Sequence, residues 1–180
     1  LESYNKLKKD SLYFNSLYAQ GYCYLKSGQY NSAIEKFKKS RKHNVDSNIL
    51  HDIHVRLGDS YFLLMNYAAS ANFYNEALKI GGLQDDYSAY KKSTSHVLLE
   101  DYEKAVKSLN DLISRFPNSN YVDDAVFNLG NVYIATKDFD RAISSFSKIT
   151  SDFKNSLFFS SSKLKLGLVY YMKQEDQTAI

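Results

Sequence analysis

Residues 129–146 read LGNVYIATKDFDRAISSF, and five of these residues carry the spacing that decides the fold. A small residue is followed by an aromatic residue at +3, an aromatic at +9, a small residue at +12 and a bulky apolar residue at +16: Gly130, Tyr133, Phe139, Ala142 and Phe146. Apolar residues recur at three- and four-residue steps on both sides of Thr136-Lys137-Asp138. This pattern predicts two helices joined by a short turn.

The same spacing occurs five times along the chain. The copies are anchored 37, 35, 37 and 37 residues apart, at Gly21, Gly58, Ser93, Gly130 and Gly167. The third copy departs most, with Ser93 and His96 at its first two positions, and the fifth reaches only Ala179, before its +16 position. A repeat of this length, built from two helices, predicts an all-α solenoid of stacked antiparallel helix pairs.

Each copy also predicts how its two helices meet. Glycine in the middle of a helix costs up to ~1 kcal/mol relative to alanine, so its recurrence indicates close approach of a neighbouring helix. In the first copy, Gly28 is expected to take a left-handed backbone in the turn. Ala33 is expected where the two helices cross, Phe37 where the next repeat covers it, and Cys23 as a small buried residue.

Composition limits the classes of function. The net charge of +3 gives no strong field that would favour nucleic acid or an anionic membrane. No stretch approaches the ~20 apolar residues of a membrane-spanning helix, so we expect neither nucleic-acid binding nor direct membrane insertion. With one cysteine, no intrachain disulfide can form. The chain starts without methionine and stops inside a helical pattern, so we expect it to be a portion of a longer protein.

The repeats resemble the tetratricopeptide repeat. The family's Leu-Gly pair is matched at Leu57-Gly58, Leu129-Gly130 and Leu166-Gly167. Its second-helix aromatic is matched at Tyr30, Tyr67, Tyr102 and Phe139, and its small residue at Ala33, Ala105, Ala142 and Ala179. Its closing proline is matched at Pro117. The early tryptophan is absent and the spacing exceeds the family's 34 residues, so we expect longer turns between repeats. The resemblance implies one right-handed α-solenoid domain, with repeats at 14–47, 51–84, 86–119 and 123–156, a partial repeat at 160–180, and residues 1–13 ending a preceding helix.

In that family the first helix of each repeat lines a concave groove. The matching positions are candidates for binding a protein or peptide partner, in a groove expected to be aromatic with few charges: Tyr18, Tyr22, Lys26, Asp59, Phe62, Tyr87, Tyr90, Phe127, Asn131, Ile134, Leu168 and Tyr171. The alternative is that several of these rings pack against neighbouring helices. Tyr18 and Tyr22 stand where the family's carboxylate clamp requires lysine and asparagine, which argues against a chaperone-tail receptor.

A narrower resemblance lies in residues 113–119 and 123–130, ISRFPNS and DDAVFNLG. It is similar to repeats of bacterial envelope proteins: the Tol-Pal accessory protein, the outer-membrane assembly lipoprotein BamD and large Bacteroidetes-type repeat proteins. This similarity implies a periplasmic or envelope-associated adaptor rather than a cytoplasmic one. The alternative is a structural segment of a long repeat protein, whose uncapped last repeat would stack on further repeats or self-associate.

Candidate chemistry has simpler explanations in this sequence. His51 and His54, three residues apart, lack a visible third metal ligand and are expected to lie at the surface or between repeats. Asp85-Asp86 and Asp123-Asp124 precede predicted helices, where acidic residues interact favourably with the helix dipole. The basic run of Lys36, Lys38, Lys39, Arg41, Lys42 and His43 is expected to be a solvated helix end. We therefore expect a scaffold that is not an enzyme and needs no cofactor or metal.

Overall fold

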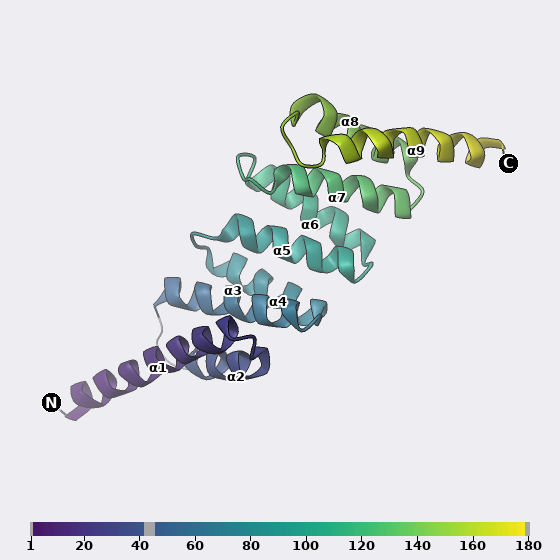
Figure 1. The fold of residues 1–180 in the computed structure, drawn as a ribbon. Helices are drawn as coiled ribbons and strands as arrows, with labels where there is room; N and C mark the ends of the chain where they lie inside the picture. Colours follow the sequence, from purple (N-terminus) through teal and green to yellow (C-terminus); the bar gives the residue numbers. More distant parts are fainter. Residues whose placement is uncertain (1, 42–45, 179–180) are drawn as a thin grey trace. The chain divides into compact units, whose positions relative to one another are not determined.

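The computed structural model describes residues 2–41 and 46–178, and the side chains of residues 12–41 and 46–176. Within these ranges the chain forms helices and no strand, which confirms the all-α prediction (Figure 1). The helices are α1 (Glu2–Lys26), α2 (Tyr30–Ser40), α3 (Ser47–Leu63), α4 (Tyr67–Ile80), α5 (Asp85–Leu98), α6 (Tyr102–Arg115), α7 (Val122–Ala135), α8 (Phe139–Asp152) and α9 (Phe159–Thr178).

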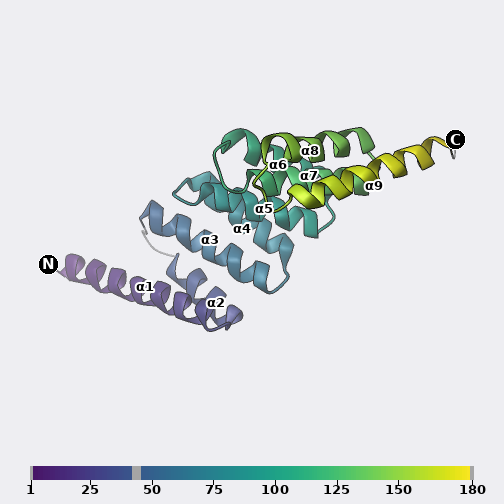
Figure 2. The same ribbon diagram turned by 45° about the horizontal axis from the view of Figure 1, so that its top comes forward.

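The chain divides into two compact units, each of which is described by itself. Unit 1 comprises Leu1–Ser95 and unit 2 comprises His96–Ile180. In unit 1, α1 packs on α2, α2 on α3 and α3 on α4; in unit 2, α7 packs on α6 and α8, and α8 packs on α9. Figures 1 and 2 show α1 beside α2 and α3 beside α4. The single domain expected from the sequence stays a prediction.

The spacing between copies varies in the connections between repeats. Three residues join the two helices inside each of the first four repeats. Six residues separate α2 from α3, α6 from α7 and α8 from α9, whereas four separate α4 from α5. This difference confirms that the extra residues lengthen the connections between repeats. The expectation that residues 1–13 end a separate helix is wrong, because Glu2–Lys26 is one helix; no proline or glycine interrupts it before Gly21.

The turns inside the repeats have a common geometry. The seventh residue after each anchor takes positive φ, at Gly28 (76°), Met65 (58°), Glu100 (55°) and Lys137 (58°). Gly28 therefore has the left-handed backbone predicted for it, while the other three turns use side chains that disfavour this region. Two residues later, the aromatic at +9 begins the second helix in all four repeats. In three of them, the residue before that aromatic caps the helix through its side chain.

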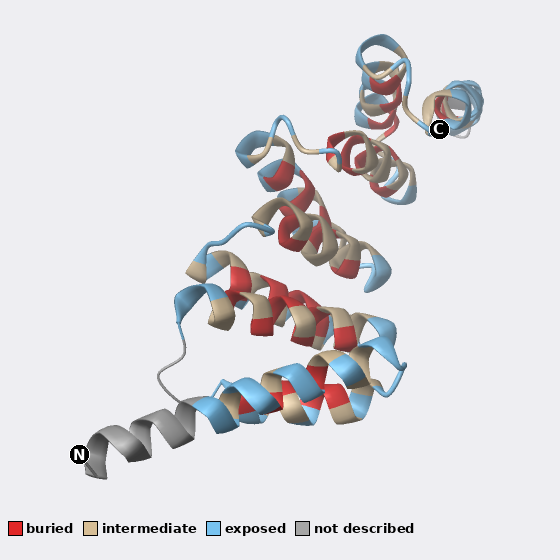
Figure 3. Cartoon of the chain, turned by 60° about the vertical axis from the view of Figure 1, so that its left-hand side comes forward, coloured by how far each residue is buried: buried red, intermediate tan, exposed pale blue. Residues whose placement is uncertain are grey.

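Three of the four anchor glycines lie beneath aromatic rings, and Gly167 is the exception. A Cβ added to Gly21 would lie 2.6 Å from the Phe37 ring, and one added to Gly130 would lie 2.5 Å from the Phe146 ring. The same relation joins Gly58 to Tyr74. The covering ring is the +16 residue of the same repeat and is fully buried in each case, which confirms the close approach predicted from the glycines. Figure 3 shows that buried residues gather where paired helices face each other.

Candidate functional site

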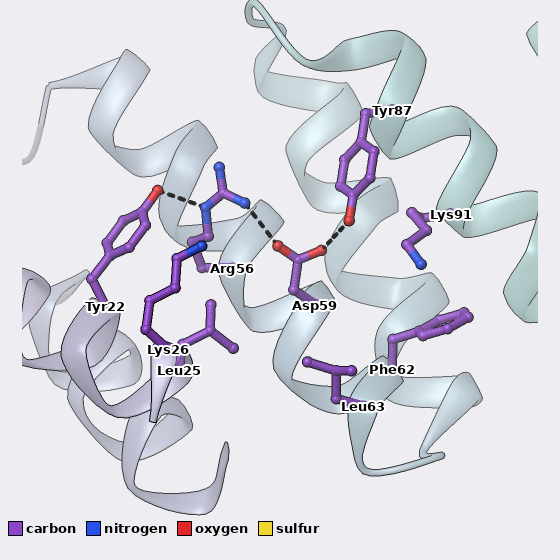
Figure 4. A pocket seen from close by; sticks show the side chains of 9 residues that line it. All are labelled: Tyr22, Leu25, Lys26, Arg56, Asp59, Phe62, Leu63, Tyr87 and Lys91. Carbon is purple, nitrogen blue, oxygen red and sulfur yellow. Dashed lines mark hydrogen bonds and ion pairs between the residues drawn. The ribbon is translucent and has the colours of Figure 1, made fainter. Parts of the chain in front are cut away.

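A cavity of about 440 Å³ in unit 1 is lined by α1, α3 and α5, the first helices of three successive repeats. We call it the inner groove. Figure 4 shows the side chains of its walls, with Arg56 and Asp59 between Tyr22 and Tyr87. Its lining residues are Tyr22, Leu25 and Lys26 from α1, Arg56, Asp59, Phe62 and Leu63 from α3, and Tyr87 and Lys91 from α5.

Three charged residues of α3 form one continuous strip in and beside the groove. Asp52, Arg56 and Asp59 are spaced four and three residues apart, so they share a helix face. Arg56 donates from Nη2 to Asp52 Oδ1 at 2.9 Å and from Nη1 to Asp59 Oδ2 at 2.8 Å. It also donates to Gln84 Oε1 at 3.0 Å. The guanidinium thus holds both carboxylates of its own helix.

Tyrosine hydroxyls from the neighbouring helices complete this strip. Tyr18 and Tyr22 of α1 donate to Asp52 Oδ2 at 2.7 and 3.0 Å, and Tyr22 accepts from Arg56 Nε at 2.7 Å. Their rings pack edge-on against Phe37 in the core. On the other side, Tyr74 of α4 and Tyr87 of α5 both donate to Asp59 Oδ1, at 2.6 and 2.7 Å. The strip therefore ties α3 to α1, α4 and α5.

The environment fixes the protonation states of this network. Burial, and next the charge of Asp59, raise the pKa of Tyr74 and Tyr87. Burial also raises the pKa of Tyr18, where Asp52 adds to the effect. Burial alone would lower the pKa of Arg56, but Asp52 and Asp59 outweigh it and raise the pKa overall. The tyrosines therefore remain hydrogen-bond donors and the guanidinium remains charged at neutral pH.

Five of the twelve candidate residues meet in the inner groove: Tyr22, Lys26, Asp59, Phe62 and Tyr87. Tyr18 lies next to them on Asp52, and Tyr90 is half-buried on α5. Arg56 and Lys91 also line the groove, and neither was among the twelve candidates. The expectation of few charges is wrong, since three cations and one carboxylate line this cavity. The four- and three-residue spacing of opposite charges on α3 was the available signal.

The candidates in unit 2 have other surroundings. Phe127 stacks on Phe158 with ring centroids 4.5 Å apart, and Ile134 packs against the cluster around Phe146. Asn131 is half-buried on α7. Leu168 and Tyr171, with Leu164, form an exposed stripe on α9. Phe127 and Ile134 therefore follow the packing alternative, and the structure does not bring the unit 2 candidates together in a described cavity.

His51 and His54 both face the packed interior of unit 1. His51 Nε2 lies 3.0 Å from Asp85 Oδ1 on α5, the helix that begins the next repeat. His54 donates from Nδ1 to the carbonyl of Leu50 at 2.8 Å and lies against the ring of Phe73 on α4. The prediction of a position at the surface or between repeats is confirmed for His51, whereas His54 is buried against α4 of its own repeat and the prediction is wrong for it. The described residues contain no group of three or more potential metal ligands.

Acidification is expected to destabilise unit 1 through His54. Burial lowers the pKa of His54, with Arg41 and His51 acting in the same direction and the Leu50 carbonyl and Glu76 opposing them. The unfolded chain, with a histidine pKa of about 6.5, then binds the proton more readily. The contribution of neutral His54 to the free energy of unfolding is therefore fully present above pH ~6.5. It is lost as the pH drops toward the folded-state pKa, by at most about 1.4 kcal/mol per pH unit.

Urea unfolding between pH 7.5 and 5.5 measures this effect. His54→Phe keeps an aromatic ring beside Phe73 and removes the titration, so the variant should lose less stability over this range than the parent chain. The same change in stability in both proteins would show that His54 makes no contribution to the pH dependence.

The other charged and reactive candidates occupy ordinary positions. Lys38 donates to Tyr61 Oη at 2.7 Å, Lys39 pairs with Glu35 and Arg41 lies over the Phe73 ring, so these cations serve helix packing and the helix end. Lys42 and His43 lie outside the described residues. The paired acidic residues are in the first turns of α5 and α7, as predicted.

The expectation of a buried Cys23 is wrong, since this residue is exposed. It lies two residues beyond buried Gly21, about 200° around α1. The face of α1 that carries Gly21 packs on α2, so Cys23 points to the opposite side. Among the described helices, none combines the length and the apolar character that crossing a membrane requires.

Comparisons with known proteins agree with this architecture. Models of the tetratricopeptide repeat match residues 18–85, 87–119 and 124–156. Anaphase-promoting complex subunit 3 of Schizosaccharomyces pombe is 26% identical over 121 residues, which are 67% of this chain and 17% of that protein. The chain thus spans a small part of this curated relative.

Solved structures share the fold at low sequence identity. The apo form of RapI superposes with a TM-score of 0.78 at 16% identity, covering 99% of this chain and 55% of that one. A tetratricopeptide repeat protein from Parabacteroides merdae superposes with a TM-score of 0.75 at 19% identity, covering 90% and 62%. At these identities the likeness concerns the fold alone.

Proposed function

We propose that this chain, which belongs to the tetratricopeptide repeat family, is a non-catalytic interaction module that binds a peptide segment of a protein partner in the inner groove. The observation that carries the proposal is the 440 Å³ cavity lined by three successive first helices. This volume lies in the usual range for ligand pockets and accommodates side chains of an extended segment.

The state of the charged groups favours binding over catalysis. The carboxylates of Asp52 and Asp59 accept hydrogen bonds from tyrosine hydroxyls and from Arg56. A general acid or base has to exchange a proton with its substrate, whereas these groups are engaged in holding helices together. Leu25 of α1 and Leu63 of α3 add apolar surface to the lining of the inner groove. One relative is by name a subunit of the anaphase-promoting complex, which is consistent with a role in protein assemblies.

A selection from random peptides displayed on phage tests this function. Peptides selected on the parent chain should bind Leu63→Asp at least about tenfold more weakly, because a carboxylate would replace an apolar wall of the groove. Leu63 is half exposed, so the substitution should leave the helices intact. Leu83→Asp, on a fully exposed loop residue of unit 1 outside the groove, is the matched control and should bind like the parent. Failure to select any peptide, or equal binding by Leu63→Asp, would overturn the proposal.

A second candidate function is a structural segment of a longer repeat array. The open face of α9 favours it: Leu164, Leu168 and Tyr171 are exposed, and no atom covers Gly167 as Phe146 covers Gly130. A further helix pair stacked on α9 would bury this stripe. If the chain has only this structural role, the phage selection described above should yield no peptide that binds the inner groove. The same experiment therefore separates the two functions. The location in a bacterial envelope remains a proposal that rests on residues 113–130.

A further inference from the structure

The side of α9 that faces away from α8 carries an exposed apolar stripe. Leu164, Leu168 and Tyr171 are spaced four and three residues apart, so they share one helix face. Their exposed fractions are 79%, 49% and 62%. We call these three residues the α9 stripe. On the opposite face, Val169 is fully buried in the cluster that contains Phe146 of α8. α9 therefore packs on α8 with one face and leaves a second apolar face open among the residues that the structure describes.

The order of residues in the α9 stripe makes it complementary to itself. Gly167 and Leu168 stand midway between Leu164 and Tyr171, with three residue steps on either side. An antiparallel copy of α9 centred on this midpoint would place Leu164 of each copy beside Tyr171 of the other, and Leu168 beside its own counterpart. A Cβ added to Gly167 would have no atom within 4 Å, so the backbone at the midpoint leaves room for a second helix to approach.

The charges of α9 favour the same antiparallel arrangement. Two lysines lie in its first half and two carboxylates lie in its last turn: Lys163, Lys165, Glu175 and Asp176. Lys173, the third lysine of the helix, pairs with Asp140 of α8. Carboxylates at the C-terminal end of a helix face the negative end of the helix dipole, which is unfavourable. A second α9 that runs in the opposite direction would bring its positive N-terminal half beside these carboxylates, whereas a parallel one would set like charges side by side.

We propose that α9 pairs two copies of this chain across a two-fold axis, with the two α9 stripes in contact and Lys163 of each copy beside the acidic last turn of the other. This inference concerns unit 2 and does not depend on the peptide groove, which lies in unit 1. It differs from the stacking of a further repeat on α9, because a two-fold contact closes at two copies whereas a head-to-tail contact between copies continues.

Sedimentation equilibrium over a series of protein concentrations measures the pairing. The parent chain should show a monomer–dimer equilibrium with no larger species. Leu168→Asp should weaken the pairing at least about tenfold, because it places two carboxylates next to each other in an apolar contact. Leu157→Asp makes the same change at an exposed residue between α8 and α9, outside the α9 stripe, and should pair like the parent. Circular dichroism should show the same helicity in all three proteins, since both substituted residues are exposed.

An exchange of charges tests the antiparallel direction of the two helices. Lys163→Glu should pair with itself about fivefold more weakly than the parent, because carboxylates would then meet at both ends of the contact. Glu175→Lys should show a similar loss, because lysines would meet there. An equimolar mixture of the two variants should pair nearly as well as the parent, since each end of the mixed pair joins opposite charges.

Three results would contradict the inference. The first is a parent chain that stays monomeric up to about 1 mM, and the second is pairing that Leu168→Asp leaves unchanged. The third is growth beyond two copies as the concentration rises, which would assign the α9 stripe to head-to-tail stacking of repeats instead. A mixture of Lys163→Glu and Glu175→Lys that pairs no better than either variant alone would exclude the antiparallel contact. None of these results bears on the inner groove, because no peptide takes part.

Discussion

Gly130→Val is expected to lower the free energy of unfolding of unit 2 by about 3 kcal/mol. A Cβ at residue 130 would lie 2.5 Å from the Phe146 ring, and valine adds two further methyl groups. Phe146 of α8 is fully buried in a cluster with residues of α7 and α9, so its ring has little room to move away. The gain in helix propensity, about 0.5 kcal/mol, is too small to offset overpacking. Urea unfolding followed by circular dichroism measures the change.

Gly167 provides the matched control, because it is the equivalent glycine of the fifth copy with no atom within 4 Å of an added Cβ. It lies inside α9, where alanine is preferred over glycine. Gly167→Ala should therefore stabilise unit 2 by about 0.5 to 1 kcal/mol. If Gly130→Val were tolerated as well as Gly167→Ala, the aromatic cover would not be the reason for glycine at the anchor position.

The fold could be predicted because the same contact between two helices recurs in successive repeats. Gly21 and Phe37 are sixteen residues apart in sequence, and so are Gly130 and Phe146, so a single contact generates a regular spacing. The turn residues were less informative. Met65 and Lys137 take the left-handed backbone that the sequence indicated only at Gly28, because the geometry of the repeat overrides their local preference.

The candidate site was only partly predictable, for a related reason. Family positions identified Tyr22 and Phe62 as groove residues, since these positions follow from the repeat. Arg56 and Lys91 both stand two residues before the anchor of their copy, a position that was not among those taken from the family. The role of Tyr18 was also hidden, because its hydroxyl reaches Asp52 thirty-four residues away. Side-chain hydrogen bonds of this range depend on the packed geometry of three helices.

Asp59→Ala is expected to lower the free energy of unfolding of unit 1 by about 3 kcal/mol, at the lower end for a broken buried ion pair because both partners retain some exposure. The substitution removes the acceptor of the Tyr74 and Tyr87 hydroxyls and one carboxylate partner of Arg56. Tyr74 is fully buried, so its hydroxyl would find no water to replace the lost acceptor. Urea unfolding measures the loss, and Glu76→Ala, which removes an exposed ion pair with Lys79, should leave stability unchanged within error.

Tyr74→Phe tests whether this loss comes from the hydrogen bonds to Asp59. It removes one hydroxyl and should cost about 2 kcal/mol, the value for a hydrogen bond to a charged group. In the double variant Asp59→Ala, Tyr74→Phe, the loss should be smaller than the sum of the two single losses, because both substitutions remove the same contact. Additive losses would mean that Asp59 stabilises unit 1 without Tyr74. A sub-additive loss would establish that one carboxylate of α3 joins α4 to the lining of the inner groove.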